Sequence, residues 1–247
     1  MKATEEFLEY VNQFNNLNKK IVLKKNHTLR VVSLCEEIAR ELKLSQEEIE
    51  LVKLCGLLHD IGRFEQINRY DSYDDLSTLD HGDVGEMILK KDKLINRFSK
   101  NNHNTILRAV KYHNKYRVPN TLNEKNKLFV NITRDADKID ILNLIVKGEI
   151  SIKTNNTKMS NKIYKGFFNK KMLKNKDIKT PADEIASKLA FIFDLNFKES
   201  YKIVKNKNYV NKIIEIQMEE TNNKDLINQL KEIKKVMNNY IEEMIQC

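Results

Sequence analysis

Apolar side chains recur every three or four residues along most of the chain, which is the period of amphipathic α-helices. Phe7, Val11 and Phe14, placed just after Thr4, predict an opening helix. A second stripe that begins at Val31 and continues through Cys35, Ile38 and Leu42 predicts another. His27 lies one turn before Val31, so it belongs to the inward face of that second helix.

The rest of the chain continues in the same way. Ser45 and Glu48 form a capping box for a third helix, which ends in Leu57-Leu58-His59-Asp60. Periodicity then fails, and we expect a loop from Gly62 to Leu79. The further helices that the pattern predicts run from Asp80 through Leu89, across Ile106 to His113 before Pro119, roughly from Glu124 to Val146, from Thr180-Pro181 onward, and twice more before Cys247.

The composition supports an all-α protein. Six Gly and two Pro among 247 residues leave little material for turn-rich β architecture, and no strand-like alternation is long enough to compete with the helical period. This length suits a core domain with an appendage. We therefore predict a helical core over residues 1–150, and over residues 151–247 a lysine-rich connector with C-terminal helices packed on that core.

Cysteine usage and hydropathy point to the cytoplasm. Cys35, Cys55 and Cys247 are widely spaced and form no CxxC pair, which disfavours disulfide scaffolds and thiolate zinc sites. No apolar run reaches the roughly 18 residues that a membrane span requires. The N-terminal residues lack the apolar core of a signal peptide. We expect a soluble cytoplasmic protein that does not bind membranes.

Positive charge is concentrated in one segment. The net charge is +9, and between Ser151 and Lys176 there are eight lysines and no acid. The favoured interpretation is a solvated surface segment, and the alternative is an electropositive rim that attracts an anionic substrate. Tyr164, Phe167 and Phe168 interleave with these lysines, but no nucleic-acid motif surrounds them, so nucleic acid is not the expected partner.

His59 and Asp60 end a strongly apolar run, where polar groups need partners. One interpretation is that His59 and Asp60 bind a divalent metal. The other is that His59 interacts with the C-terminal end of its helix and pairs with the neighbouring Asp60. Three more of the five histidines, His27, His81 and His113, lie on predicted inward faces or at helix ends. His103 follows two asparagines and is expected to be structural. Asp137, flanked by Ala136 and followed by Ile139, is predicted to be partly buried and therefore to need a cation.

The order His, His-Asp, Asp on helices resembles the HD-domain superfamily of metal-dependent phosphohydrolases, from about His27 to Asp140. The resemblance implies an HD-domain helical bundle, here with additional C-terminal helices. It implies that His27, His59, Asp60 and Asp137 hold a first metal. It further implies that His81 and His113 complete a second site, with Asp60 as the bridge. The cofactor would be one or two divalent ions, with Mn, Fe, Co, Ni and Mg all open.

Such a centre has positions open for water and substrate. A metal-activated water, with its pKa lowered towards ~7, would be the attacking group, and the metals would offset charge on the phosphoryl group. Asp60, Arg63 and Lys138 are the expected catalytic residues, the two cations lying near the phosphate. The alternatives are ion pairs of Arg63 with Asp74 or Asp75, and of Lys138 and Arg134 with Asp135 or Asp140. Gln66 and Tyr73 are expected to line the pocket.

The expected function is hydrolysis of a nucleotide or another small phosphorylated compound. Two alternatives stay open: a two-iron oxygenase of the same superfamily, and a non-catalytic helical module that senses a nucleotide or binds a partner. The basic net charge favours hydrolysis, because it suits an anionic substrate. The sequence does not indicate an oligomeric state.

Overall fold

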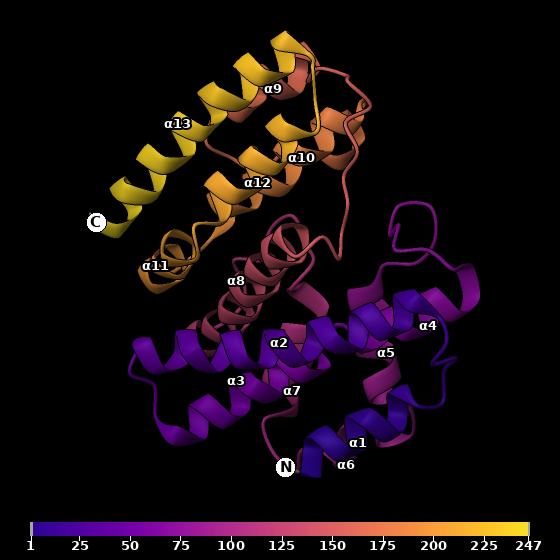
Figure 1. Ribbon diagram of the computed structural model, residues 1–247. Coiled ribbons are helices and arrows are strands. Elements are labelled where there is room, and N and C mark those ends of the chain that lie inside the picture. The colour runs from indigo at the N-terminus through magenta and orange to yellow at the C-terminus, as the bar shows by residue number, and fades with distance from the viewer. Residues whose placement is uncertain (1, 247) are drawn as a thin grey trace. The chain divides into compact units, whose positions relative to one another are not determined.

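The computed structural model describes residues 2–246, apart from the side chain of Asp92. Helices account for all the regular secondary structure within that range, which confirms the all-α prediction (Figure 1). The chain divides into two compact units, Met1–Asp137 and Lys138–Cys247. The predicted division at residue 150 and the packing of the C-terminal segment on the core stay predictions.

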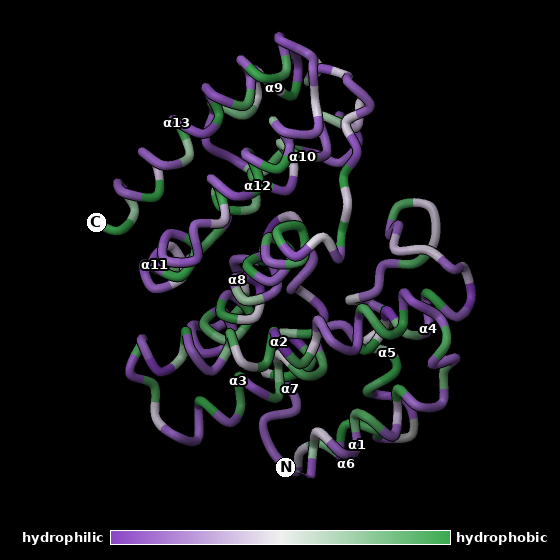
Figure 2. The backbone as a smooth tube through the Cα atoms, in the orientation of Figure 1, coloured by the Kyte–Doolittle hydropathy of each residue, from purple (hydrophilic) through white to green (hydrophobic). Residues whose placement is uncertain are grey.

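The first unit holds the helices α1 (Lys2–Val11), α2 (Lys19–Glu41), α3 (Gln46–Leu58), α4 (Ile61–Tyr70), α5 (His81–Lys90), α6 (Ile95–Phe98) and α7 (His103–Tyr112), the 3₁₀ turn η1 (Lys91–Lys93), and α8 (Glu124–Val146) as far as Asp137. Helix α2 packs against α3 and α4, while α7 packs against α3 and α5 (Figure 1). Hydrophobic and hydrophilic positions alternate along these helices, as the amphipathic pattern requires (Figure 2).

Local signals set where the helices of this unit begin. The Ser45–Glu48 capping box is present at the start of α3. The Asp80 carboxylate accepts hydrogen bonds from the amides of Gly82 and Asp83 and so caps α5. Side chains such as those of Val31, Cys35, Val52 and Leu58 are fully buried and form the core beneath the site.

The expected loop from Gly62 to Leu79 is wrong over its first half, because α4 occupies residues 61–70. Ile61, Phe64 and Ile67 follow one another at a spacing of three residues and are buried, and this stripe outweighs the polar residues between them. The irregular segment is limited to residues 71–80, and it begins at Asp71, whose left-handed backbone ends the helix.

The second unit continues α8 from Lys138 and adds α9 (Asn161–Phe167), α10 (Pro181–Leu189), α11 (Lys198–Lys207), α12 (Tyr209–Glu219) and α13 (Lys224–Gln246), with 3₁₀ turns η2 (Asn175–Asp177) and η3 (Ala190–Asp194). The predicted start at Thr180-Pro181 is confirmed by a capping box with Asp183. Three α-helices follow α10, where the sequence predicted two. Asn208 takes up a left-handed conformation and separates α11 from α12.

Several lysines of the basic segment have acidic partners within the second unit. The ammonium groups of Lys158 and Lys170 lie 2.9 and 2.7 Å from the carboxylates of Asp225 and Glu243. Lys162 pairs with Asp177 at 2.5 Å. These pairs are partly exposed and agree with a solvated charged surface. Across residues 2–246, no helix combines the length and the apolar character that crossing a membrane demands.

Candidate metal centre

The six predicted ligands meet within the first unit, although they come from six helices and their ends. His27 lies in the middle of α2, and Asp137 lies in α8. His59 and His113 are the residues that follow α3 and α7, while Asp60 directly precedes α4. His81 is the first residue of α5. The four histidines and Asp60 are buried, at no more than 2% exposure.

The two carboxylate oxygens of Asp60 face two different pairs of histidines. Asp60 Oδ2 lies 3.6 Å from His27 Nε2 and 3.4 Å from His59 Nε2. Asp60 Oδ1 lies 3.2 Å from His81 Nε2 and 3.6 Å from His113 Nε2. His27, His59 and Asp60 form one group with the spacing of metal ligands, and Asp60, His81 and His113 form a second. We call these the first and second half-sites.

Asp137 belongs to the first half-site. Its Oδ1 atom lies 3.1 Å from His27 Nε2 and 3.8 Å from His59 Nε2. Its side chain is 16% exposed, which agrees with the partial burial predicted from its neighbours. With two imidazoles and two carboxylates, the first half-site has the mixed nitrogen and oxygen donors that divalent transition metals accept.

The hydrogen bonds of the rings leave donor atoms for a metal. His59 Nδ1 lies 2.7 Å from the carbonyl oxygen of Gly56, and His113 Nδ1 lies 2.7 Å from that of Val110. A carbonyl only accepts, so each Nδ1 carries the hydrogen and each Nε2 has a lone pair. The buried His59 Nε2 has no hydrogen-bond partner. Because a buried polar atom without a partner is costly, this atom fits a metal ligand.

Electrostatics favour the charge states that ligands need at Asp60 and His113, whereas at His59 burial lowers the pKa less than Asp60 and Asp137 raise it. Burial would raise the pKa of Asp60, but the Lys24 ammonium and the neighbouring histidines hold it well below its ordinary value. Burial, together with the nearby rings of His81 and His59, lowers the pKa of His113 to about 4. An ionised carboxylate and a neutral imidazole are the forms that bind metal.

Lys24 is a residue of the site that sequence reasoning missed. Its ammonium lies 2.6 Å from Asp60 Oδ2, and its side chain is 13% exposed. The ammonium also lies 5.8 Å from the centre of the Tyr73 ring. The available signal was its position on α2, one helical turn before His27 and therefore on the same face.

Arg63 is held by the loop at residues 71–80. Its Nη1 atom lies 2.7 Å from Asp75 Oδ1, and it donates to the carbonyl oxygen of Tyr73 at 2.7 Å. This ion pair was the alternative interpretation of Arg63. Its Nε atom is buried without a hydrogen-bond partner and lies 3.7 Å from Asp60 Oδ1. A contact between Arg63 and a phosphate stays a prediction, as does the lining role of Gln66 and Tyr73.

The other cations have structural partners. The Lys138 ammonium lies 3.0 Å from the Asp194 carboxylate in the second unit, and its role toward a phosphate also stays a prediction. Arg134 donates from Nη1 to the carbonyl oxygens of Tyr112, His113 and Lys115. It therefore caps the end of α7, where His113 stands. His103 Nε2 lies 2.8 Å from the carbonyl oxygen of Ser99, outside the centre, as expected.

A close backbone approach brings the His59–Asp60 corner next to His81. A Cβ atom at Gly62 would lie 2.2 Å from the carbonyl oxygen of His81 and 2.6 Å from the Gly85 amide nitrogen. Both atoms belong to the backbone of α5, so only a residue without a side chain fits. Gly62 thus sets the distance between α4 and α5.

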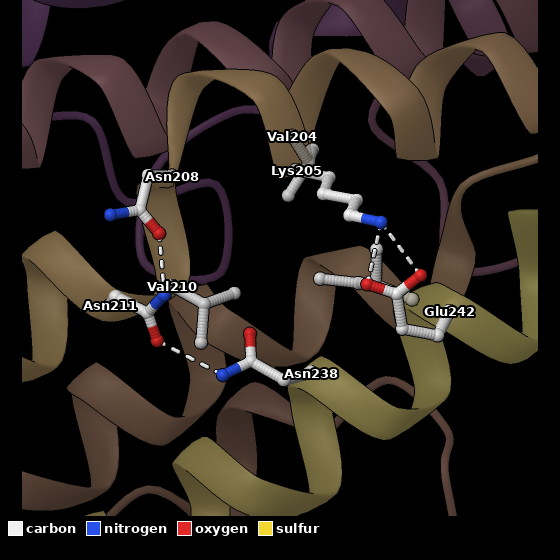
Figure 3. Close-up of a pocket in the computed structure, with 8 residues that line it drawn as sticks. Val204, Lys205, Asn208, Val210, Asn211, Asn238 and Glu242 are labelled. Carbon is white, nitrogen blue, oxygen red and sulfur yellow. Dashed lines mark hydrogen bonds and ion pairs between the residues drawn. The ribbon is translucent and has the colours of Figure 1, made fainter.

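The second unit carries a separate pocket of about 290 Å³ between α11, α12 and α13 (Figure 3). Its polar lining is internally paired: Asn238 donates to Asn211 at 3.0 Å, and Lys205 lies 2.7 Å from Glu242. None of the predicted site residues lines this pocket.

Comparison with protein families finds one description for the segment that holds the centre. Residues 25–142 match the model of the HD domain, and this range contains all six proposed ligands. No curated protein and no solved structure matches the chain. The matched range and its paired His/Asp groups identify residues 25–142 as an HD domain.

Proposed function

We propose that the chain is a metal-dependent phosphohydrolase that acts on a nucleotide or another small phosphorylated compound. One observation carries the proposal: each oxygen of Asp60 faces its own pair of histidine Nε2 atoms. A carboxylate placed in this way suits two cations. His27, His59, Asp60 and Asp137 would hold the first, and Asp60, His81 and His113 the second.

A divalent metal bound there would supply Lewis acidity toward a phosphoryl oxygen and would make water a better nucleophile at neutral pH. The chain itself supplies the rest. The main-chain carbonyls of Gly56 and Val110 orient the rings of His59 and His113. Lys24, slightly exposed beside Asp60, adds positive charge at the centre, which favours an anionic substrate.

The test starts from protein purified without chelator. Elemental analysis identifies the metal, and phosphate release from nucleotides and from a generic phosphoester is then measured with Mn, Co, Ni, Fe and Mg. The variant Asp60→Ala removes a ligand from both half-sites, so we expect activity to fall at least about a hundredfold while helicity is retained.

Asp83→Ala is the matched control, because Asp83 is an exposed acid of α5 that pairs with Lys115. We expect it to keep full activity. Unchanged hydrolysis by Asp60→Ala would remove the assignment. Oxygen consumption with an organic substrate, in place of phosphate release, would indicate the two-iron oxygenase instead.

A further inference from the structure

The Nδ1 atom of His81 has a different kind of partner from the Nδ1 atoms of His59 and His113. His59 and His113 each stand at the end of a helix, so a carbonyl three residues earlier is available to the ring. His81 is the first residue of α5 and has no preceding helical turn. Its Nδ1 atom lies 2.9 and 2.8 Å from the two carboxylate oxygens of Asp75.

Asp75 is itself fixed by a set of donors. Arg63 Nη1 lies 2.7 Å and Gln66 Nε2 3.0 Å from its Oδ1 atom. The side-chain nitrogen Nδ2 of Asn114, the residue after His113, lies 3.4 Å from Asp75 Oδ2. The Asp75 carboxylate is therefore surrounded by donors.

The loop that carries Asp75 is tied to α4. The fully buried Gln66 donates to the hydroxyl of Thr78 and to the carbonyl oxygen of Leu79, both at 2.8 Å. Arg63 donates to the carbonyl oxygen of Tyr73. These bonds anchor residues 71–80 from both sides of Asp75, so its position relative to His81 is defined by the fold.

We propose that Asp75 is a positioning residue that sets the orientation and the tautomer of His81 and thereby builds the second half-site, an inference that rests on the two-ion centre proposed above. The carboxylate accepts the Nδ1 hydrogen, which leaves Nε2, 3.2 Å from Asp60 Oδ1 and 2.9 Å from His113 Nε2, as the ring atom available to an ion. A carboxylate behind a histidine ligand also makes the ring more basic than a carbonyl does. The second half-site therefore depends on a loop, whereas the residues of the first lie within helices or directly at helix ends.

The variant Asp75→Asn tests this assignment. The neighbours of Asp75 are all donors, so an amide would direct its own N–H groups at one of them. In a Mn²⁺ titration we expect two ions in the wild type, with the exchange-coupled electron paramagnetic resonance signal of a bridged pair. In the variant we expect the second ion to bind about 10- to 100-fold more weakly, with the affinity of the first unchanged and the coupled signal lost.

Two further variants serve as the negative and the positive control for this result. Asp74→Asn is the matched control, because Asp74 is the adjacent acid and its carboxylate accepts from the Leu76 amide within the loop. It should keep both ions. His81→Ala removes the ring itself and should weaken binding of the second ion at least as much as Asp75→Asn. Circular dichroism of each variant checks that the helices persist. Retention of both ions by Asp75→Asn, with affinities within twofold of the wild type, would overturn the proposal.

A measurement without metal separates this inference from the proposed function. Nitrogen-15 spectra of labelled histidine, recorded on chelated wild-type protein at about pH 8, report which ring nitrogen carries the hydrogen. We expect a hydrogen on Nδ1 of His81 in the wild type and loss of that preference in Asp75→Asn. An Nδ1 atom of His81 without a hydrogen in the wild type would overturn the role of Asp75. A wild type that binds no Mn²⁺ would instead refute the two-ion centre, and the role of Asp75 in the second half-site with it.

Discussion

The substitution Gly62→Ala probes the approach of α4 and α5 that forms the centre. The added methyl group would lie 2.2 Å from the His81 carbonyl oxygen and 2.6 Å from the Gly85 nitrogen. Ordinarily, alanine stabilises a helix by about 0.5–1 kcal/mol relative to glycine. Overpacking costs about 1–3 kcal/mol, and backbone atoms cannot rotate away, so the upper end applies.

The net effect is a destabilisation of about 2 kcal/mol, which corresponds to a fall in Tm of about 4–8 °C for a chain of this size. Thermal unfolding followed by circular dichroism in EDTA measures it without any contribution from bound metal. Because α5 must shift, His81 moves with it, and the second Mn²⁺ should also bind more weakly in a titration of the same variant.

Gly166→Ala is the control for this experiment. A Cβ atom there would lie 3.4 Å from the end of the Leu173 side chain, an ordinary contact that a flexible group can accommodate. We expect it to leave the Tm unchanged or to raise it slightly through helix propensity. A Gly62→Ala variant that melts at or above the wild-type temperature would refute the argument.

Three other predictions follow from the same structure. Adding Mn²⁺ at about 100 times its Kd to chelated protein should stabilise the fold by about 2.7 kcal/mol and raise the Tm by several degrees in calorimetry; equal melting temperatures would contradict a folded-state metal site. Arg134→Met removes a cation that binds three carbonyls at the end of α7 and should cost about 2–4 kcal/mol in urea denaturation, whereas the more exposed Arg108→Met should cost less than about 1 kcal/mol. Burial would raise the pKa of Glu86, but Lys111 and Lys90 hold it below its ordinary value. The ionised Glu86 therefore stabilises the folded state fully above the unfolded-state pKa, and this stabilisation is lost as the pH falls through the folded-state pKa. Urea denaturation of Glu86→Gln should therefore show its full penalty near pH 7. The penalty should shrink as the pH falls below the unfolded-state pKa of about 4.3 and vanish below the lower folded-state pKa, and a penalty independent of pH would contradict this.

Some contacts of the centre could not be predicted from the sequence. The Lys24–Asp60 pair joins residues 36 positions apart, and the place of Lys24 one helical turn before His27 does not show which carboxylate it meets. The link from Asp75 to His81 is short in sequence, yet it depends on how residues 71–80 turn back toward α5. The helix at residues 61–70 was missed because its three apolar positions are separated by charged and polar residues.

Helical class could be predicted from the sequence, because periodicity and capping are local properties. The six proposed ligands were implied by the order of His and Asp residues, which resembles that of the HD domain. The pairing of each Asp60 oxygen with its own histidines, and the support of His81 by Asp75, were decided by the tertiary structure alone. These contacts depend on helix crossings and on the close approach at Gly62, which bring together side chains as far apart as His27 and Asp137. Local sequence determines which face of a helix a residue occupies, and only packing determines which atom that face meets.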